Sequence, residues 1–247
     1  MDIAGKIALV TGAAIRVGRQ TALELARAGA DLLIHYRTSQ SQAEQTADAI
    51  RAAGRRAATV QADFARPAEA CDRLLAAIDG NFGRIDILVN NASAYVPGSP
   101  DSLPPEQWAY LLAVNVTTPT MLAERIGQRM VRQGGGAAGA IVNMLDIQAR
   151  RPWPAHLGDG MAAGALWSAT IGLARKFAPT VRVNGVAPGT VLWNEKDGDD
   201  LKRRIIERTP LRRIGEPKDV AKAVRFLIEN EYITGQVLCV DGGRSMG

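Results

Sequence analysis

The chain of 247 residues has few of the features that metal-binding, disulfide-bonded or membrane-spanning proteins need. It contains two cysteines, Cys71 and Cys239, and two histidines, His35 and His156, and the members of each pair lie far apart. We therefore expect neither a zinc site nor a disulfide framework. Its longest apolar stretches are about five residues, whereas a membrane helix needs ~20. The first residues show no signal-peptide pattern, so we expect a cytoplasmic protein that binds no membrane.

The charge is basic but dispersed. Thirty Lys and Arg against twenty-five Asp and Glu give a net charge of +5. The densest basic run, 201–213, is interrupted by Ile and Glu. A nucleic-acid site would gather its charge on one face, so we expect no nucleic-acid partner. Two interpretations of the excess remain, a solvated surface or a site that holds a phosphate-bearing cofactor.

Apolar runs typical of buried strands alternate with helical patterns along the chain. Strands are expected at 6–10, 31–36, 57–62, 86–91, 139–144, 181–186 and 236–241. Helices are expected at 19–30, 41–54, 66–80, 105–132, 160–177 and 217–229, with a glycine-rich loop at 132–140. This alternation predicts βαβ units, and no change of composition marks a domain boundary. We therefore predict a single domain over 1–247, an α/β Rossmann-type doubly wound parallel sheet.

A glycine-rich turn, 11–18, joins the first strand to the first helix. Gly12 and Gly18 let backbone N–H groups approach a pyrophosphate, which the helix N-terminus also attracts. Arg16 adds a positive charge where a middle glycine is common. The turn predicts a dinucleotide site, and a plain tight turn is the alternative.

The second strand ends in residues that favour NADP(H) over NAD. An NAD site has an acidic residue here for the ribose 2′-hydroxyl, whereas this chain has Arg37, Thr38 and Ser39. A guanidinium and two hydroxyls suit a 2′-phosphate. The alternative is that Arg37 is an exposed loop arginine.

At this point the chain resembles the short-chain dehydrogenase/reductase family over its whole length. The matching residues are 11–18, Asp63, Asn90-Asn91-Ala92-Ser93, Asn115, Arg182-Val183-Asn184, Pro188-Gly189 and Asp241-Gly242-Gly243. The resemblance implies that Asp63 and Phe64 contact the adenine and that Pro188 and Gly189 lie against the nicotinamide. The implied cofactor-binding set is Gly12, Arg16, Val17, Gly18, Tyr36, Arg37, Thr38, Ser39, Asp63, Phe64, Asn91, Ala92, Ser93, Pro188 and Gly189.

Within that family the chain looks most like the pteridine reductases, especially the bacterial dihydromonapterin/dihydrofolate reductase branch. The features that carry this resemblance are Arg16, the segment 35–39, Tyr95, Asp146 in place of a serine, and the segment 191–195. The branch implies substrate contacts from Arg16, Tyr95, Asp146 and Trp193. Core or lid packing is the alternative for Tyr95 and Trp193.

The Tyr-x3-Lys motif of the wider family is missing. Counting thirteen residues on from Asp146 gives Asp159 where tyrosine is expected, and Ala163 stands where lysine is expected. None of the four tyrosines is followed four residues later by lysine. In the family the tyrosine exchanges the proton and the lysine lowers the tyrosine pKa.

Two carboxyl groups are candidates to replace that chemistry. Asp159 and Ala163 share a helix face, and Asp159 is expected to face Asp146 across the site. Two adjacent carboxylates do not both ionise easily, so the pKa of one is expected to rise. A protonated Asp could then supply the proton. The alternative is that Asp159 is a solvated or capping carboxylate at a helix start.

The sequence therefore favours an NADPH-dependent reductase of a pterin-like heterocycle with an altered proton relay. A family member that binds NADP(H) or a pterin without redox turnover remains an alternative, as does a non-redox lyase or dehydratase. The resemblance also implies a homotetramer or dimer built through the helices at 105–132 and 158–177.

Overall fold

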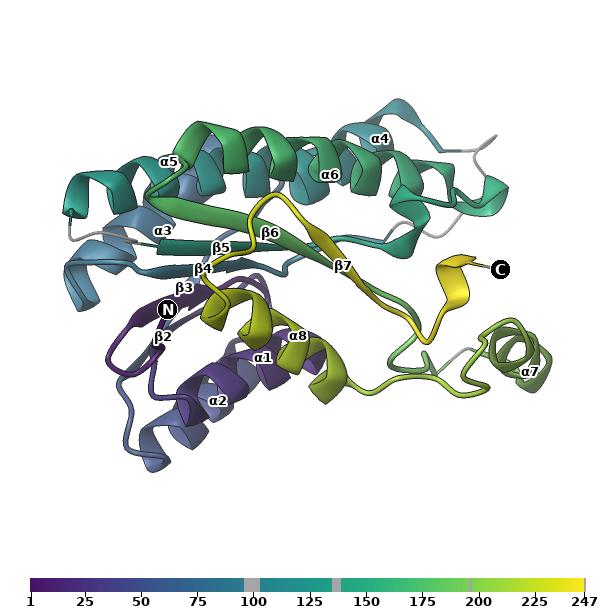
Figure 1. Cartoon of the computed structure of the whole chain (residues 1–247), viewed down its shortest axis with the longest axis horizontal. Coiled ribbons are helices and arrows are strands. Elements are labelled where there is room, and N and C mark those ends of the chain that lie inside the picture. Colours follow the sequence, from purple (N-terminus) through teal and green to yellow (C-terminus); the bar gives the residue numbers. More distant parts are fainter. Residues whose placement is uncertain (96–102, 135–138, 196, 247) are drawn as a thin grey trace.

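A computed structural model describes residues 1–95, 103–134, 139–195 and 197–246, and its centre is one parallel sheet (Figure 1). The strands are β1 (Ile7–Val10), β2 (Asp31–Tyr36), β3 (Ala57–Gln61), β4 (Ile87–Asn90), β5 (Gly139–Met144), β6 (Val181–Pro188) and β7 (Val237–Val240). Their order is β3-β2-β1-β4-β5-β6-β7, with every neighbouring pair parallel. The order reverses direction at β1 and β4, as in a doubly wound fold, and confirms the predicted α/β class.

Helices cover both faces of the sheet (Figure 1). One face carries α1 (Arg16–Arg27), α2 (Gln40–Ala52) and α8 (Pro217–Glu229). The other carries α3 (Pro67–Asn81), α4 (Pro105–Leu112), α5 (Thr118–Gln133) and α6 (Leu157–Phe177). Within the described residues, no helix has both the length and the hydropathy that a membrane span requires.

The strand residues alternate between two hydrophobic cores. In β1, Ala8 and Val10 pack toward α1, α2 and α8, whereas Ile7 and Leu9 pack toward α3, α5 and α6. Successive side chains of a strand point to opposite faces, so a strand covered on both sides is apolar throughout. This burial accounts for the continuous apolar runs of the five central strands, whereas the edge strands β3 and β7 are only partly buried.

The helix expected at 105–132 is not continuous. A π-helical turn, η2 (Ala113–Thr117), separates α4 from α5 and carries Asn115. The Asn115 amide donates to the Ala94 carbonyl and accepts from the Ala94 N–H at 2.8 and 2.7 Å. The side chain thus ties the helix to the loop that follows β4, and π turns of this kind often occur at functional sites.

Two further segments differ from the sequence-based expectation. The helix expected at 160–177 begins at Leu157, which places Asp159 inside its first turn. A short helix, α7 (Asp199–Glu207), lies in the basic segment and has no buried residue. Of the loop expected at 132–140, residues 135–138 lie outside the described part of the chain.

Candidate active site

The glycine turn after β1 is built around two close approaches. Gly12 has a φ of +63°, and a Cβ on Gly18 would lie 2.2 Å from the Gly12 carbonyl oxygen. Both positions therefore require glycine. No side chain caps the start of α1, so the N–H groups of its first turn remain available to an anion. The turn fits the pyrophosphate of a dinucleotide.

The His35 ring supports this turn through hydrogen bonds, a role that the sequence did not predict. Its Nδ1 accepts the Gly12 N–H at 3.0 Å, and its Nε2 lies 3.1 Å from the Ala62 carbonyl. The ring stacks on Phe64 with centroids 4.5 Å apart. Burial lowers the pKa of His35 to about 4, so the neutral ring accepts on one nitrogen and donates from the other.

The loop after β2 presents the residues predicted for the 2′-phosphate. Arg37 and Thr38 are exposed, and Ser39 is half-buried. The Arg37 guanidinium donates to the Tyr110 hydroxyl of α4, so it lies across the carboxyl end of the sheet. The geometry places these side chains beside the glycine turn, because β1 and β2 are adjacent strands.

The predicted adenine residues follow β3. The Asp63 carboxylate accepts the Ala65 N–H at 3.0 Å and is half-buried. The Phe64 side chain is buried against His35, so any contact that Phe64 makes to a base comes from its backbone.

The segment after β4 is tied to the glycine turn. The Thr11 hydroxyl accepts the N–H groups of Asn91 and Ala92, each at 2.9 Å. The Asn91 amide donates to the carbonyls of Thr11 and Gly12. Asn91 and Ala92 thus support the turn as well as lining it, and Ser93 next to them is exposed.

The end of β6 brings the predicted nicotinamide and substrate segments together. A Cβ on Gly189 would lie 2.8 Å from the Cα of Asp241, so β6 and β7 approach closely here. Arg16, with a φ of +55°, donates to Asn194 at 3.4 Å and so joins the glycine turn to the segment 191–195. Trp193 in that segment is half-buried.

Asp146 and Asp159 lie close enough for the negative charge of Asp146 to act on Asp159. Burial raises the pKa of Asp159 to about 6, and the charge of Asp146 adds to that rise. Burial also raises the pKa of Asp146, although the Gln148 backbone N–H donates to it at 2.7 Å. The predicted rise thus appears at both carboxyls, and its larger cause is burial rather than mutual repulsion.

Asp159 is not a capping residue. Its side chain is 14% exposed, and α6 has no side-chain hydrogen bond at its N-cap. The helix dipole favours an ionised carboxyl in a first turn. In this site burial outweighs the dipole, so Asp159 holds its proton to a higher pH than a solvated carboxyl does.

His156 links two of the predicted residues, a contact that the sequence did not reveal. Its Nδ1 lies 3.2 Å from the Tyr95 hydroxyl and 3.8 Å from Asp159 Oδ2. The ring of Trp153 meets the His156 ring edge-on at 6.2 Å, and the Arg244 guanidinium lies 4.5 Å above Trp153. The spacing of His156 and Asp159 at i and i+3 is the sequence feature from which their contact could have been predicted.

No lysine on the site side of α6 replaces the missing one. Ala163 is buried one turn after Asp159. Lys176 lies 17 residues after Asp159, about 25 Å along the helix, and pairs with Glu124 of α5. Of the four tyrosines, all of them described, Tyr36 ends β2, Tyr110 accepts a hydrogen bond from Arg37 of the cofactor loop, and Tyr232 is fully exposed. Tyr95 is the phenol that lies beside His156 and Asp159.

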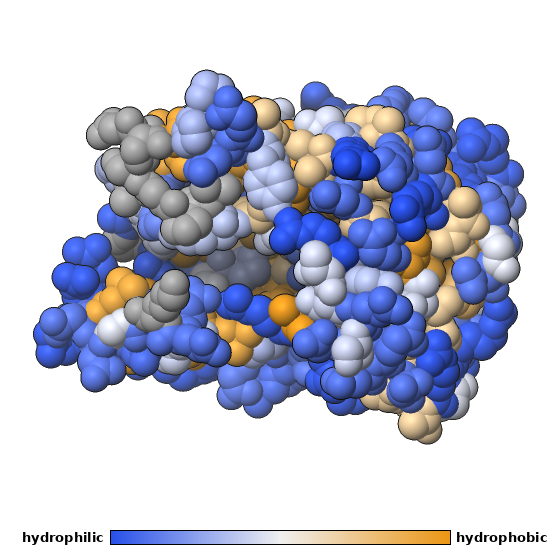
Figure 2. All heavy atoms as spheres, turned by 180° about the vertical axis from the view of Figure 1, so that it is seen from behind, coloured by the Kyte–Doolittle hydropathy of each residue, from blue (hydrophilic) through white to orange (hydrophobic). Residues whose placement is uncertain are grey.

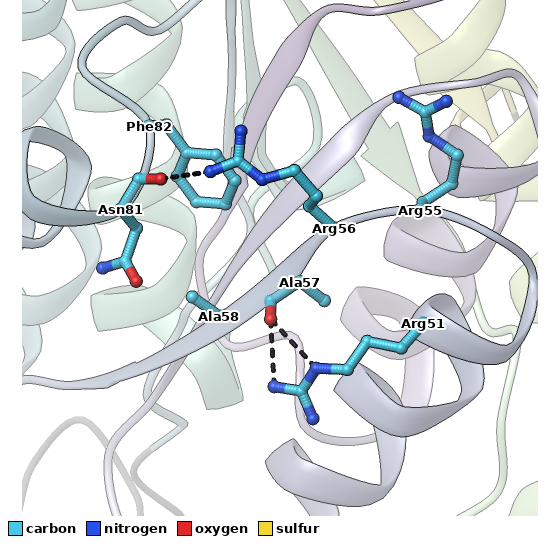
Figure 3. Close-up of a pocket in the computed structure, with 7 residues that line it drawn as sticks. All are labelled: Arg51, Arg55, Arg56, Ala57, Ala58, Asn81 and Phe82. Atoms are coloured by element: carbon cyan, nitrogen blue, oxygen red, sulfur yellow. Dashed lines mark hydrogen bonds between the residues drawn. The ribbon is translucent and has the colours of Figure 1, made fainter.

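A basic pocket of about 390 Å³ lies at the opposite end of the sheet, beside the start of β3 (Figure 3). It is lined by Arg51, Arg55, Arg56, Ala57, Ala58, Asn81 and Phe82. Partners of the three guanidiniums include, in order, the Ala57 carbonyl, the Asp31 carboxylate and the Asn81 carbonyl. Since each of these arginines has a protein partner, part of the basic charge serves the fold.

The predicted cofactor and catalytic residues follow the carboxyl ends of the strands or begin the helices after them. Figure 2 shows the molecule hollowed at the end that carries α7. A nucleotide turn and a titratable cluster at the carboxyl edge of a parallel sheet define a dinucleotide-binding α/β protein.

The family described as Enoyl-(Acyl carrier protein) reductase matches residues 12–245. The chain is also 38% identical over 244 residues to an uncharacterized oxidoreductase of Mycobacterium tuberculosis, across 96% of this chain and 91% of that protein. The chain belongs to the short-chain dehydrogenase/reductase family, and it is an NAD(P)-dependent oxidoreductase of that family.

Two solved structures are similar over nearly all of their length. FolM alternative dihydrofolate reductase 1 of Brucella canis, complexed with NADP, is 32% identical with a TM-score of 0.91, covering 100% of this chain and 96% of that one. A short chain dehydrogenase of Burkholderia cenocepacia, in complex with NADP, is 34% identical with a TM-score of 0.90, covering 99% of each.

Other relatives have similar identity and different names. They include a 3-oxoacyl-[acyl-carrier-protein] reductase of Staphylococcus epidermidis and an L-rhamnose 1-dehydrogenase of a Sphingomonas. The comparisons therefore confirm the predicted family, fold and cofactor class, and they do not single out the pteridine reductase branch.

Proposed function

We propose that the chain is an NADPH-dependent reductase of a pterin-like heterocycle, of the dihydropterin or dihydrofolate type. The observation that carries this proposal is a cluster at the carboxyl edge of the sheet, in which Asp159 lies near Asp146 and is joined through His156 to the exposed ring of Tyr95. The likeness to a FolM alternative dihydrofolate reductase supports it.

The cofactor is NADP(H), which supplies a hydride when bound. The glycine turn and the open start of α1 hold its pyrophosphate. Arg37, Thr38 and Ser39 hold the 2′-phosphate, and the Asp63 carboxyl and the Phe64 backbone receive the adenine. Asn91, Ala92, Pro188 and Gly189 line the ribose and nicotinamide, with Val17, Tyr36 and Ser93 beside them.

The substrate side is formed by Arg16, Tyr95, Asp146 and Trp193. Tyr95 is 59% exposed, so its ring is free to stack on a flat ligand. A carboxylate accepts two parallel hydrogen bonds from a guanidine-like edge, which pterins present, and Asp146 is suited to that role. Reduction of a ring C=N also needs a proton, and Asp159, with a pKa of about 6, holds one in mildly acidic solution.

A panel of substrates tests the proposal. Purified protein is mixed with NADPH and, separately, with a dihydropterin, dihydrofolate, a 3-oxoacyl thioester and a sugar lactone, and NADPH absorbance is followed. We expect oxidation with the first two alone. Turnover of the thioester or the lactone, with none of a dihydropterin, would contradict the proposed substrate class.

The missing Tyr and Lys favour one rival, a family member that binds NADP(H) and a pterin without turnover. Titration of both ligands by quenching of intrinsic fluorescence distinguishes it. Tight binding of both ligands with no NADPH oxidation at any pH identifies the rival.

The homo-oligomer implied by the family is a further part of the proposal. Two exposed apolar side chains, Val131 of α5 and Ile171 of α6, are available for contacts between subunits.

A further inference from the structure

Tyr95, His156 and Asp159 come from separate segments and meet at one nitrogen atom. Tyr95 follows β4, His156 ends a short 3₁₀ turn (Pro154–His156), and Asp159 lies in the first turn of α6. His156 Nδ1 is 3.2 Å from the Tyr95 hydroxyl and 3.8 Å from Asp159 Oδ2. The Tyr95 contact is within hydrogen-bond distance, whereas the Asp159 contact is an ion-pair distance that must shorten before a proton passes, as catalytic contacts do when substrate binds.

We propose that Tyr95, His156 and Asp159 form a proton relay, in which the Tyr95 hydroxyl delivers the proton to the substrate and His156 passes the proton of Asp159 to Tyr95. The inference rests on the proposed function and names its further catalytic residue. Tyr95 is the group that touches the substrate, and His156 is a positioning residue that acts through Tyr95.

The surroundings of His156 hold the ring in place for this exchange. Trp153 meets it edge-on, and Trp153 is itself covered by the Arg244 guanidinium. Arg244 donates to the Thr190 hydroxyl at 2.6 Å, which anchors this stack to the end of β6. The His156 side chain is 30% exposed, so water reaches the relay from outside.

The proton transfers balance without a net charge on the ring or the phenol. The Tyr95 hydroxyl gives its proton to the acceptor nitrogen of the substrate and becomes a phenolate. The Asp159 carboxyl gives its proton to Nδ1 of the neutral His156 ring and is left as a carboxylate, and the imidazolium so formed passes the Nδ1 proton to the Tyr95 oxygen. Solvent reprotonates Asp159, so one proton enters the substrate for each proton taken from water.

The charges around the relay are consistent with this direction of transfer. Burial raises the pKa of Tyr95, and the charges of Asp159 and Asp197 raise it further, so a Tyr95 phenolate readily takes up a proton from the relay. Asp159 faces His156 and Asp146, and Asp146 in turn faces Arg244. Asp159 is thus the member of the relay that loses its proton as solution approaches neutrality.

Conservative variants separate the role of the Tyr95 hydroxyl from the role of its aromatic ring. Tyr95→Phe keeps a ring that stacks on a pterin and removes the proton donor. We expect its turnover to fall about 10²-fold or more, the usual worth of a positioned acid, with pterin binding unchanged. His156→Asn is expected to slow turnover similarly, whereas Tyr232→Phe, which alters a fully exposed phenol, serves as the matched control. Wild-type turnover by Tyr95→Phe would overturn the relay and leave the reductase proposal standing.

Proton NMR tests the coupling in the free protein, without cofactor or substrate. The chain has only two histidines, and His35, with a pKa of about 4, does not titrate near neutrality. We expect Asp159→Asn to displace the His156 ring resonances, because Asp159 Oδ2 lies 3.8 Å from His156 Nδ1. Tyr95→Phe should displace the same resonances.

Turnover of the variants and the NMR measurement together distinguish failure of the relay from failure of the proposed function. Identical His156 ring resonances in wild type, Asp159→Asn and Tyr95→Phe would overturn the relay regardless of activity. Displaced resonances in variants of a protein that never oxidises NADPH would overturn the proposed function and the catalytic role of Tyr95 with it.

Discussion

We propose that Arg37 decides which dinucleotide the chain prefers. Its guanidinium is exposed beside the glycine turn, with no acidic residue in the loop 37–39. Loss of one charge-assisted hydrogen bond to the 2′-phosphate costs about 1.5–3 kcal/mol, or roughly 10- to 100-fold in affinity. We expect Arg37→Ala to weaken NADPH binding by that factor and to leave NADH binding unchanged. Equal affinities for NADPH and NADH in the wild-type protein would contradict the assignment.

Because the pKa of Asp159 is raised in the folded protein, ionised Asp159 lowers the free energy of unfolding. The folded carboxyl ionises near pH 6, whereas an unfolded one ionises near its ordinary value of 3.8. Above 3.8 the unfolded state therefore releases its proton first, and folding becomes less favourable as pH rises through about 6. We expect Asp159→Asn to raise the melting temperature at pH values above this window and to change it little below.

The control for this measurement is Asp79→Asn. Its hydrogen bond from Arg129 lowers the pKa of Asp79, so this substitution should give no gain at neutral pH. Equal melting temperatures for Asp159→Asn and wild type across the whole pH range would show that burial does not hold the proton on Asp159.

The turn between β1 and α1 allows no side chain at position 18. A Cβ there would lie 2.2 Å from a carbonyl oxygen and 2.4 Å from the Asn91 amide nitrogen, so the backbone must shift. We expect Gly18→Ala to weaken NADPH binding about 5- to 150-fold, since overpacking of this kind costs roughly 1–3 kcal/mol. Gly164→Ala in α6, where a Cβ meets nothing within 4 Å, is the matched control and should bind NADPH normally.

The strands and most helices could be predicted from the sequence, because a sheet buried on both faces leaves apolar runs. The π turn at Asn115 could not, since its sequence continues the helical pattern of α4 and α5. The positions of the proposed cofactor residues could be predicted, because each lies at the end of a recognisable strand or in the turn and helix start that follow it, and their roles stay predictions. The contact of His156 with Tyr95 depends on a tertiary approach across 61 positions, which no local pattern records.

Because His35 is buried, the free energy of unfolding of the whole molecule depends on pH. The folded imidazole has a pKa of about 4 against 6.5 in an unfolded chain, so the unfolded state binds a proton first as pH falls. The difference of about 2.5 units corresponds to about 3 kcal/mol, lost progressively between pH 6.5 and about 4.

Urea unfolding at both ends of that pH range tests this expectation. His35→Phe keeps a ring against Phe64 and removes the titrating group, so we expect it to lose less stability on acidification than wild type does. The same acid-dependent loss in both proteins would show that His35 contributes nothing to it.

The central claim is that an aspartic acid supplies the proton for hydride reduction of a pterin-like ring. The most direct measurement is the pH dependence of NADPH oxidation by the wild-type protein with a dihydropterin as substrate. The account predicts a rate that is high in mild acid and falls as pH rises through about 6, where Asp159 loses its proton. A rate that stays constant up to the ordinary pKa of a phenol, about 10, or no oxidation at any pH, would contradict it.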